Sequence, residues 1–211
     1  LAAAAADRSG GDVELAAISV AGQQHGMVAL DIDGRPVHPA KLWNDTESAP
    51  DAGWLISQLG GGDAGRSAWA ELTGSVPVAS FTVTKLSWLH RTHPEAWERL
   101  ARVLLPHDYL TSRMTGRSTT DRGDASGTGY WSPTTGSYVD DVLAIIDRDR
   151  DWSSVLPTVL GPYESAGSHR GALVAPGTGD NMAAALGVGA GLGDAVLSAG
   201  TSGTAFAVSG T

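Results

Sequence analysis

Cysteine is absent from the 211-residue chain, which excludes disulfide bonds and thiolate metal sites. Basic residues are few: 14 Lys and Arg stand against 23 Asp and Glu, and the net charge is −9. This acidic balance argues against a nucleic-acid partner, because such surfaces are rich in Lys and Arg. No apolar run approaches the roughly 20 residues that cross a bilayer, and the alanine-rich start lacks the basic region of a signal peptide. These absences favour a cytoplasmic protein without a membrane partner.

What the chain does contain is a regular alternation of strand-like and helix-like segments. Apolar patterning predicts strands over residues 16–21 and 27–32, the second followed by an Asp33-Gly34 turn. Helices are expected over residues 46–59, 85–90, 94–101, 106–115, 140–146 and 181–186, and a hairpin over 195–211. Strands that alternate with helices predict an α/β fold.

The stretch "GTGDN" sets one carboxylate, Asp180, between a glycine and a helix of small residues. One interpretation is a helix N-cap, which stabilises a helix by about 1 kcal/mol. The other is a functional acid. Gly177 and Gly179 remove side chains around the carboxylate, as where a backbone approaches a ligand, and Asn181 adds an amide that can fix a hydroxyl. A lone carboxylate in an open pocket suits removal of a proton from an alcohol.

The stretch "LSAGTSGTAF" places four small residues, Gly200, Thr201, Ser202 and Gly203, between two strands. Backbone amides and two hydroxyls converge at such a turn, which suits phosphate oxygens, although an ordinary hairpin has the same pattern. The chain has no G-x-x-x-x-G-K-[ST] motif, so the phosphate-binding loop of P-loop enzymes is excluded.

Two further loops carry polar or aromatic groups that suit a polyol. In "GQQHG", Gln24 and His25 offer amide and imidazole hydrogen bonds, although a single loop histidine is often merely solvated. In "LWND", Trp43 offers an apolar platform for a sugar face and Asp45 an acceptor. The alternative for the second loop is a buried core tryptophan followed by a helix cap.

These segments resemble the FGGY carbohydrate kinases, most closely those that phosphorylate D-xylulose. "SFTVTKLSWL", "LLPHDYLTSRMTG" and "TDRGDASGTGYW" lie between the "LWND" and "GTGDN" segments in the order of that family. The match runs from about residue 13 to residue 208. Each motif alone is weak, and seven in register are specific.

The resemblance implies a ribonuclease H-like fold of the actin-like ATPase superfamily, with residues 1–195 a partial sugar-binding domain and residues 196–211 the first hairpin of the nucleotide-binding domain. It implies ATP and Mg²⁺ as cofactors, D-xylulose as substrate and compatibility with a homodimer, and it assigns no residue here to a metal. Asp180 would be the general base on the sugar 5-hydroxyl. The sugar contacts implied are Gln24, His25, Trp43, Asp45 and Asn181, and the phosphate contacts are Gly200, Thr201, Ser202 and Gly203.

Three departures from the family pattern qualify this expectation. Gln24 stands where the D-xylulose kinases carry methionine. Neither the N-terminal D-x-G-T phosphate loop nor the long C-terminal domain is present, and the segment before Val174 is short by a helix and part of a strand. The chain also starts at Leu1 with what reads as a helix tail ended by residues 9–11. We therefore expect a piece of a longer protein that is inactive alone.

Two alternatives to D-xylulose phosphorylation stay open at this point. One is a kinase of another sugar or polyol, such as gluconate, fuculose or glycerol, although a glycerol kinase would need an Arg-Glu pair where Gln24 and His25 stand. The other is a catalytically silent sugar-binding fragment, which the missing phosphate loop favours and the retention of Asp180 disfavours.

Overall fold

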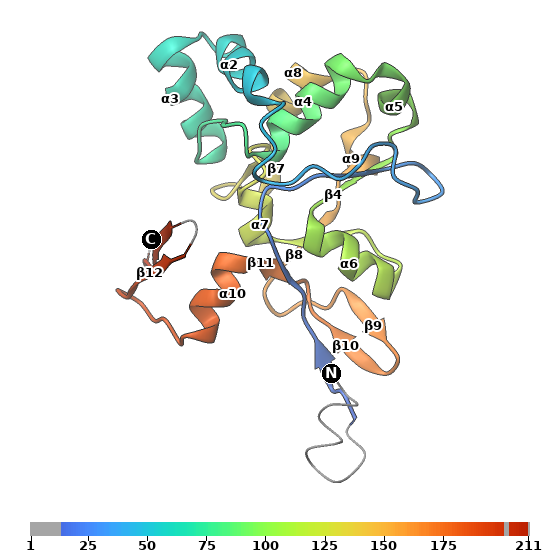
Figure 1. Cartoon of the computed structure of the whole chain (residues 1–211), viewed down its shortest axis with the longest axis vertical. Helices are drawn as coiled ribbons and strands as arrows, with labels where there is room; N and C mark the ends of the chain where they lie inside the picture. The colour runs from blue at the N-terminus through green and yellow to red at the C-terminus, as the bar shows by residue number, and fades with distance from the viewer. Residues whose placement is uncertain (1–13, 201–202, 211) are drawn as a thin grey trace.

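The fold is α/β, as the sequence predicted, with a helical layer above a set of short strands (Figure 1). The computed structural model describes residues 14–200 and 203–210. The helix tail expected over the first eleven residues therefore lies outside the described part. Within that part, no helix has both the length and the apolar character needed to cross a membrane.

The upper layer packs helices around the main apolar core. Its helices are α2 (Ala49–Gln58), α3 (Gly62–Thr73), α4 (Thr82–Thr92), α5 (Pro94–Arg99) and α8 (Asp140–Ile146), with α9 (Trp152–Val155) beneath them (Figure 1). Trp69, Leu86 and Leu143 are completely buried at the centre of this cluster. Burying side chains of this size contributes about 1.5–3 kcal/mol each, so apolar packing stabilises this layer of the fold.

The lower layer is built from paired strands that lie below the helices. β1 (Ala17–Ile18) pairs in parallel with β10 (Ala172–Val174), which pairs in antiparallel fashion with β9 (Gly167–His169). β2 (Ala21–Gly22) pairs in parallel with β11 (Thr178–Gly179). The same two chain segments thus run side by side twice, and their register shifts by one residue between the two pairings.

A glycine makes that register shift feasible. Gly177 has φ of +91°, and a Cβ there would lie 2.6 Å from Nδ1 of His107 and 2.8 Å from the Val20 carbonyl oxygen. An extra residue in one strand of a pair forms a bulge, and a left-handed backbone with no room for Cβ requires glycine at this position.

Further strand pairs connect the two layers. β3 (Val28–Leu30) is antiparallel to β4 (Arg102–Leu104), β5 (Thr119–Asp121) is parallel to β8 (Thr158–Leu160), and β6 (Trp131–Ser132) is antiparallel to β7 (Ser137–Tyr138). Helix α6 (Pro106–Thr115) follows β4, and the short helix α7 (Arg122–Ser126) follows β5 directly. These two helices contact β2 and β11, respectively.

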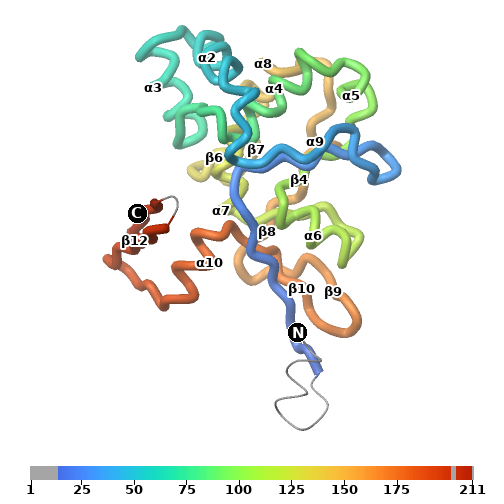
Figure 2. Tube along the Cα trace, in the orientation of Figure 1, coloured from blue at the N-terminus to red at the C-terminus, as the bar shows by residue number. Residues whose placement is uncertain are grey.

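The last described segment lies to one side of the body, where the traced chain passes through α10 (Asp180–Gly187) to the hairpin of β12 (Ala195–Ala199) and β13 (Gly203–Ala207) (Figure 2). None of the α10 residues is buried. The hairpin expected over residues 195–211 is confirmed for the residues that the structure describes.

Several predicted element bounds are wrong for identifiable reasons. The strand expected over residues 16–21 is two short strands, because the bulge in its partner interrupts the pairing. The helix expected over 94–101 ends at Arg99, because the next residues pair with β3. Helix α3 and strand β4 were not predicted. The helix over 106–115 is confirmed, with Gly116 in the left-handed conformation (φ +74°) at its end.

We predict that Gly177→Ala destabilises the fold more than Gly171→Ala does. Both glycines have positive φ, but nothing lies within 4 Å of a Cβ at Gly171. We expect about 1 kcal/mol of strain at Gly171, and about 2–4 kcal/mol at Gly177 where overpacking adds to it. Urea unfolding of both variants measures the difference, and equal losses would contradict the bulge argument.

Candidate functional site

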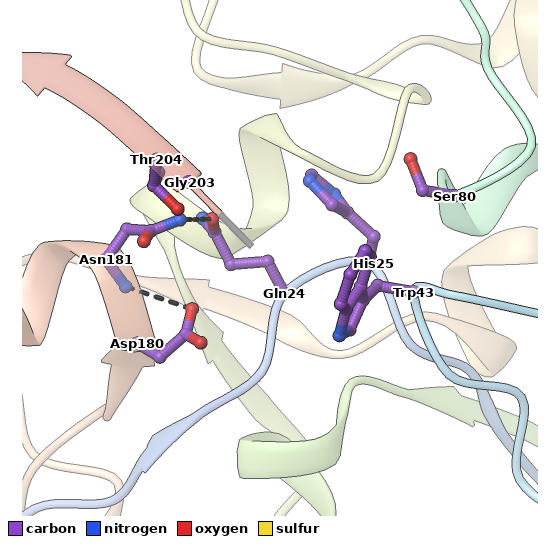
Figure 3. Close-up of a pocket in the computed structure, with 8 residues that line it drawn as sticks. All are labelled: Gln24, His25, Trp43, Ser80, Asp180, Asn181, Gly203 and Thr204. Carbon is purple, nitrogen blue, oxygen red and sulfur yellow. Dashed lines mark hydrogen bonds between the residues drawn. The ribbon is translucent and has the colours of Figure 1, made fainter. Parts of the chain in front are cut away.

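A pocket of about 330 Å³ opens where the loop after β2 faces the start of α10 and the start of β13. Its lining comes from five parts of the chain that are separate in sequence (Figure 3). The lining residues are Gln24, His25, Trp43, Ser80, Asp180, Asn181, Gly203 and Thr204. The structure thus brings together most of the candidate sugar-site residues singled out from the sequence.

Asp180 is the first residue of α10, and the N-cap is Gly179. The expectation that Asp180 itself caps the helix is therefore wrong by one position. Its Oδ1 accepts a hydrogen bond from the backbone nitrogen of Asn181 at 2.9 Å, and the side chain is exposed to the pocket (Figure 3). A carboxylate in the first turn of a helix is stabilised by the helix dipole. The helix holds this oxygen pair at the pocket wall.

Gln24 joins the loop after β2 to α10. Its Oε1 accepts a hydrogen bond from Nδ2 of Asn181 at 2.9 Å across the pocket wall (Figure 3). The glycine before Asp180 is needed for this approach, because a Cβ at Gly179 would lie 2.8 Å from Cγ and Nε2 of Gln24. The contact leaves the Gln24 amide nitrogen available to donate to a ligand.

His25 is held by its backbone, a carbonyl and an aromatic ring. Its φ is +63°, its Nδ1 lies 2.8 Å from the carbonyl oxygen of Gly127, and its ring centre lies 4.8 Å from that of Phe81. A carbonyl only accepts, so Nδ1 carries the proton. Burial lowers the pKa of the imidazole below 6.5, although the Gly127 carbonyl and Asp124 raise it. Near neutral pH the ring is uncharged, and Nε2 is an acceptor for a hydroxyl.

Trp43 and Asp45 behave differently although they share one loop. Trp43 is 48% exposed and lines the pocket, so the interpretation as a buried core tryptophan is wrong. Asp45 is not among the lining residues, and its Oδ2 accepts the backbone nitrogen of Leu42 at 2.8 Å. The carboxylate fixes the loop that carries the tryptophan.

The predicted phosphate turn is described only in part. Gly203 lines the pocket, Gly200 does not, and Thr201 and Ser202 lie outside the described residues. Ser80 and Thr204 also line the pocket but were not singled out from the sequence. Ser80 opens the "SFTVTKLSWL" segment and Thr204 directly follows the predicted turn. Both residues therefore adjoin motifs that the sequence analysis identified, but a serine or threonine alone does not indicate a binding site.

A buried polar cluster lies behind the pocket wall. Nε2 of His107 is 2.9 Å from Oδ2 of Asp124 and 3.3 Å from Oδ1 of Asp121. Burial lowers the pKa of His107, but the nearby carboxylates of Asp121 and Asp124 outweigh it and raise the pKa to about 10. One donor atom from each of the three residues lies within 4.8 Å of the others, a spacing that a cation would fit. Nothing in the "PHDYL" pattern distinguished His107 from an ordinary helix residue.

Comparison with known proteins identifies the family. Residues 6–199 match the profile described as "FGGY family of carbohydrate kinases, N-terminal domain". The chain belongs to the FGGY family of carbohydrate kinases.

Two Streptomyces relatives are longer than the chain. It is 56% identical over 205 residues to a xylulose kinase of Streptomyces coelicolor, covering 93% of this chain and 41% of the relative. A xylulose kinase of Streptomyces rubiginosus is 53% identical over 204 residues, with 92% and 41% covered. The chain thus spans about two fifths of the length of these curated relatives. The crystal structure of a Bifidobacterium adolescentis xylulose kinase is 38% identical with a TM-score of 0.83, covering 95% of this chain and 48% of that one.

We predict that His25 of this FGGY domain titrates below pH 6.5 with its neutral proton on Nδ1. Because folding lowers this pKa, the neutral ring contributes stability above pH 6.5, and that contribution is lost as the pH falls through the folded-state value. NMR of ¹⁵N-labelled histidine measures both the pKa and the tautomer. The urea-unfolded chain, in which the pKa should return to about 6.5, is the control. A folded-state pKa above 6.5 would contradict the burial argument.

Proposed function

We propose that this chain carries the sugar-binding half of an ATP-dependent kinase that phosphorylates D-xylulose on its 5-hydroxyl. The observation that carries the proposal is the position of Asp180 at the wall of a pocket that Gln24, His25 and Asn181 also line. The family match and the xylulose kinase relatives support the same reaction. On this proposal the domain adopts the ribonuclease H-like fold, residues 1–195 belong to it and residues 196–211 begin the nucleotide-binding domain.

In the proposed reaction Asp180 is the general base. The 5-hydroxyl gives its proton to a carboxylate oxygen of Asp180 as its oxygen bonds to the γ-phosphorus of ATP. The bond from that phosphorus to the β,γ-bridging oxygen breaks, so that ADP leaves with the electron pair and D-xylulose 5-phosphate forms. The proton then passes from Asp180 to water. Little covalent chemistry falls to the protein, so positioning and charge neutralisation supply most of the rate.

The sugar contacts follow from the groups that the internal hydrogen bonds leave available. Nε2 of neutral His25 accepts from a sugar hydroxyl, and the Gln24 amide nitrogen donates to a sugar oxygen. The half-exposed ring of Trp43 offers an apolar face to the sugar C–H groups. Asp45 acts through the loop on which Trp43 stands. Together these groups fit a ketose that presents several hydroxyls.

The phosphate side of the proposed site begins at the β12–β13 hairpin. Gly203 and Thr204 line the pocket opposite the sugar loop, and a small-residue turn fits phosphate oxygens because its amides are accessible. We propose Gly200, Thr201, Ser202 and Gly203 as the phosphate contacts. Mg²⁺, when bound, would neutralise the triphosphate charge, and we assign no residue of this chain to it. A homodimer belongs to the same proposal, and light scattering tests it.

We predict that Asp180→Asn in the full-length protein lowers kcat about 10³-fold and changes the sugar KM less than threefold, because loss of a general base costs about 10²–10⁴ in rate. Initial rates of ADP formation with D-xylulose measure this. Asp63→Asn, which removes an exposed carboxylate from the first turn of α3, is the matched control. Normal turnover of the Asp180→Asn variant would remove this carboxylate from the mechanism.

We predict that His25→Ala raises the KM for D-xylulose about tenfold with a smaller change in kcat, because a lost hydrogen bond to a bound hydroxyl costs about 1.4 kcal/mol. His38→Ala, which removes a ring that packs against Trp88 and His93 outside the pocket lining, should leave both constants unchanged. If the KM for ATP rose instead, the assignment of His25 to the sugar would be wrong.

Assays of the full-length protein with D-xylulose, gluconate, fuculose and glycerol decide among the substrates. The highest kcat/KM with D-xylulose supports the proposal. A preference for another acceptor would support the kinase activity and would contradict D-xylulose as the substrate. Sugar binding without ADP formation in any assay would identify a silent binding domain.

A further inference from the structure

The buried cluster behind the pocket lies against the two strands that lead to the sugar loop and to Asp180. We infer that His107 is a positioning residue of the kinase site, whose ion pairs to Asp121 and Asp124 hold the two glycine strands that carry the sugar loop and Asp180. This inference rests on the proposed function, and neither the sequence motifs nor the lining of the pocket assigns His107 any part in it.

His107 ties α6 to the start of α7. The side chains of His107 and Asp124 are 0% and 1% exposed, and their nearest atoms are 2.9 Å apart. Asp121, the second partner, is the N-cap of α7 and accepts the backbone nitrogens of Gly123 and Asp124. One imidazole therefore fixes both the cap and the first turn of α7. Because α7 has only five residues, its own backbone hydrogen bonds stabilise it little, and these contacts add to its packing against β5 and β11.

The glycine strands rest directly on the ion pair. A Cβ at Gly177 would lie 2.6 Å from Nδ1 of His107, and one at Gly22 would lie 3.0 Å from the His107 Cβ. A Cβ at Gly179 would lie 2.6 Å from Oδ1 of Asp124. No side chain separates β2 or β11 from these two groups, so a shift of the pair shifts the strands.

The strands lead to the proposed site residues within one or two positions, so the position of each strand sets that of the residue that follows it. Gln24 follows Gly22 of β2 by two residues, and Asp180 directly follows Gly179 of β11. A third link runs through the other end of α7, where the carbonyl of its C-cap Gly127 accepts from His25. The positions of the Gln24 amide, the Asp180 carboxylate and the His25 ring therefore all depend on the pair of His107 and Asp124.

A proton on both ring nitrogens of His107 would offset the charge of the carboxylates packed around it. Asp108, Asp121 and Asp124 surround His107, and Asp108 lies 3.4 Å from its Nδ1. Buried carboxylates without a counter-charge destabilise a fold strongly. A protonated ring supplies that charge, whereas a bound metal ion would need Nε2 without its proton. The protonation state of Nε2 of His107 therefore distinguishes an ion pair from a bound metal ion.

The test compares His107→Gln with His107→Lys in the full-length protein. Gln has a similar length and no charge, and Lys restores a cation. Because a misplacement of about 1 Å can cost 10²-fold in rate, we expect His107→Gln to lower kcat with D-xylulose about 100-fold and His107→Lys to recover at least a tenth of the wild-type value. His169→Gln, which alters a ring that contacts the Met114 carbonyl away from the pocket, should keep the wild-type kcat.

A second measurement does not depend on activity. NMR of ¹⁵N-labelled histidine should show both ring nitrogens of His107 protonated at pH 7.5, with no change after treatment with EDTA. A neutral His107, a melting temperature that falls on removal of metal, or an unchanged kcat in a folded His107→Gln variant would each overturn the inference. If wild-type protein phosphorylates no sugar, the proposed function fails while the NMR result still reports on the ion pair.

Discussion

The parallel contact between β2 and β11 is the constraint on which the rest of the site depends. Gly22 faces Gly179 across this pair, and the chain leaves the pair on one side towards Gln24 and on the other towards Asp180. The hydrogen bond from Asn181 to Gln24 then joins residues 157 positions apart in the sequence. The proposed base and the proposed sugar loop can face one pocket only because two short strands bring them to the same edge.

The glycines that let β2 and β11 approach their neighbours closely also make the two strands less stable, and the surrounding structure offsets that loss. Glycines in strands lose more conformational entropy on folding than other residues and bury no side chain, so β2 and β11 are weak elements by themselves. β2 packs against α6 and β11 packs against α7, and the groups that approach the strand glycines are His107 and Asp124, not apolar side chains. In the role we infer for His107, placement of the strands is coupled to a buried ion pair, which is a more orientation-dependent contact than apolar packing.

The residues that surround the pocket combine rigid and exposed parts. His25 has a left-handed backbone conformation, which a non-glycine residue adopts at a cost, and its ring is restrained by Gly127 and Phe81. Restraint of this kind lowers the entropy lost when a ligand binds. No residue of α10, β12 or β13 is buried, so the two walls of the pocket differ in how much packing stabilises them.

The sequence by itself determined the α/β class, the helix over residues 106–115, the final hairpin and most of the residues that line the pocket, because turn glycines, helix caps and motif order are local properties. It did not reveal the bulge at Gly177, the exclusion of Asp45 from the pocket lining or the cluster around His107. Those features depend on which strand pairs with which and on what lies beneath it. Only the tertiary structure decided them, because distances between residues far apart in the chain are set by packing and not by local pattern.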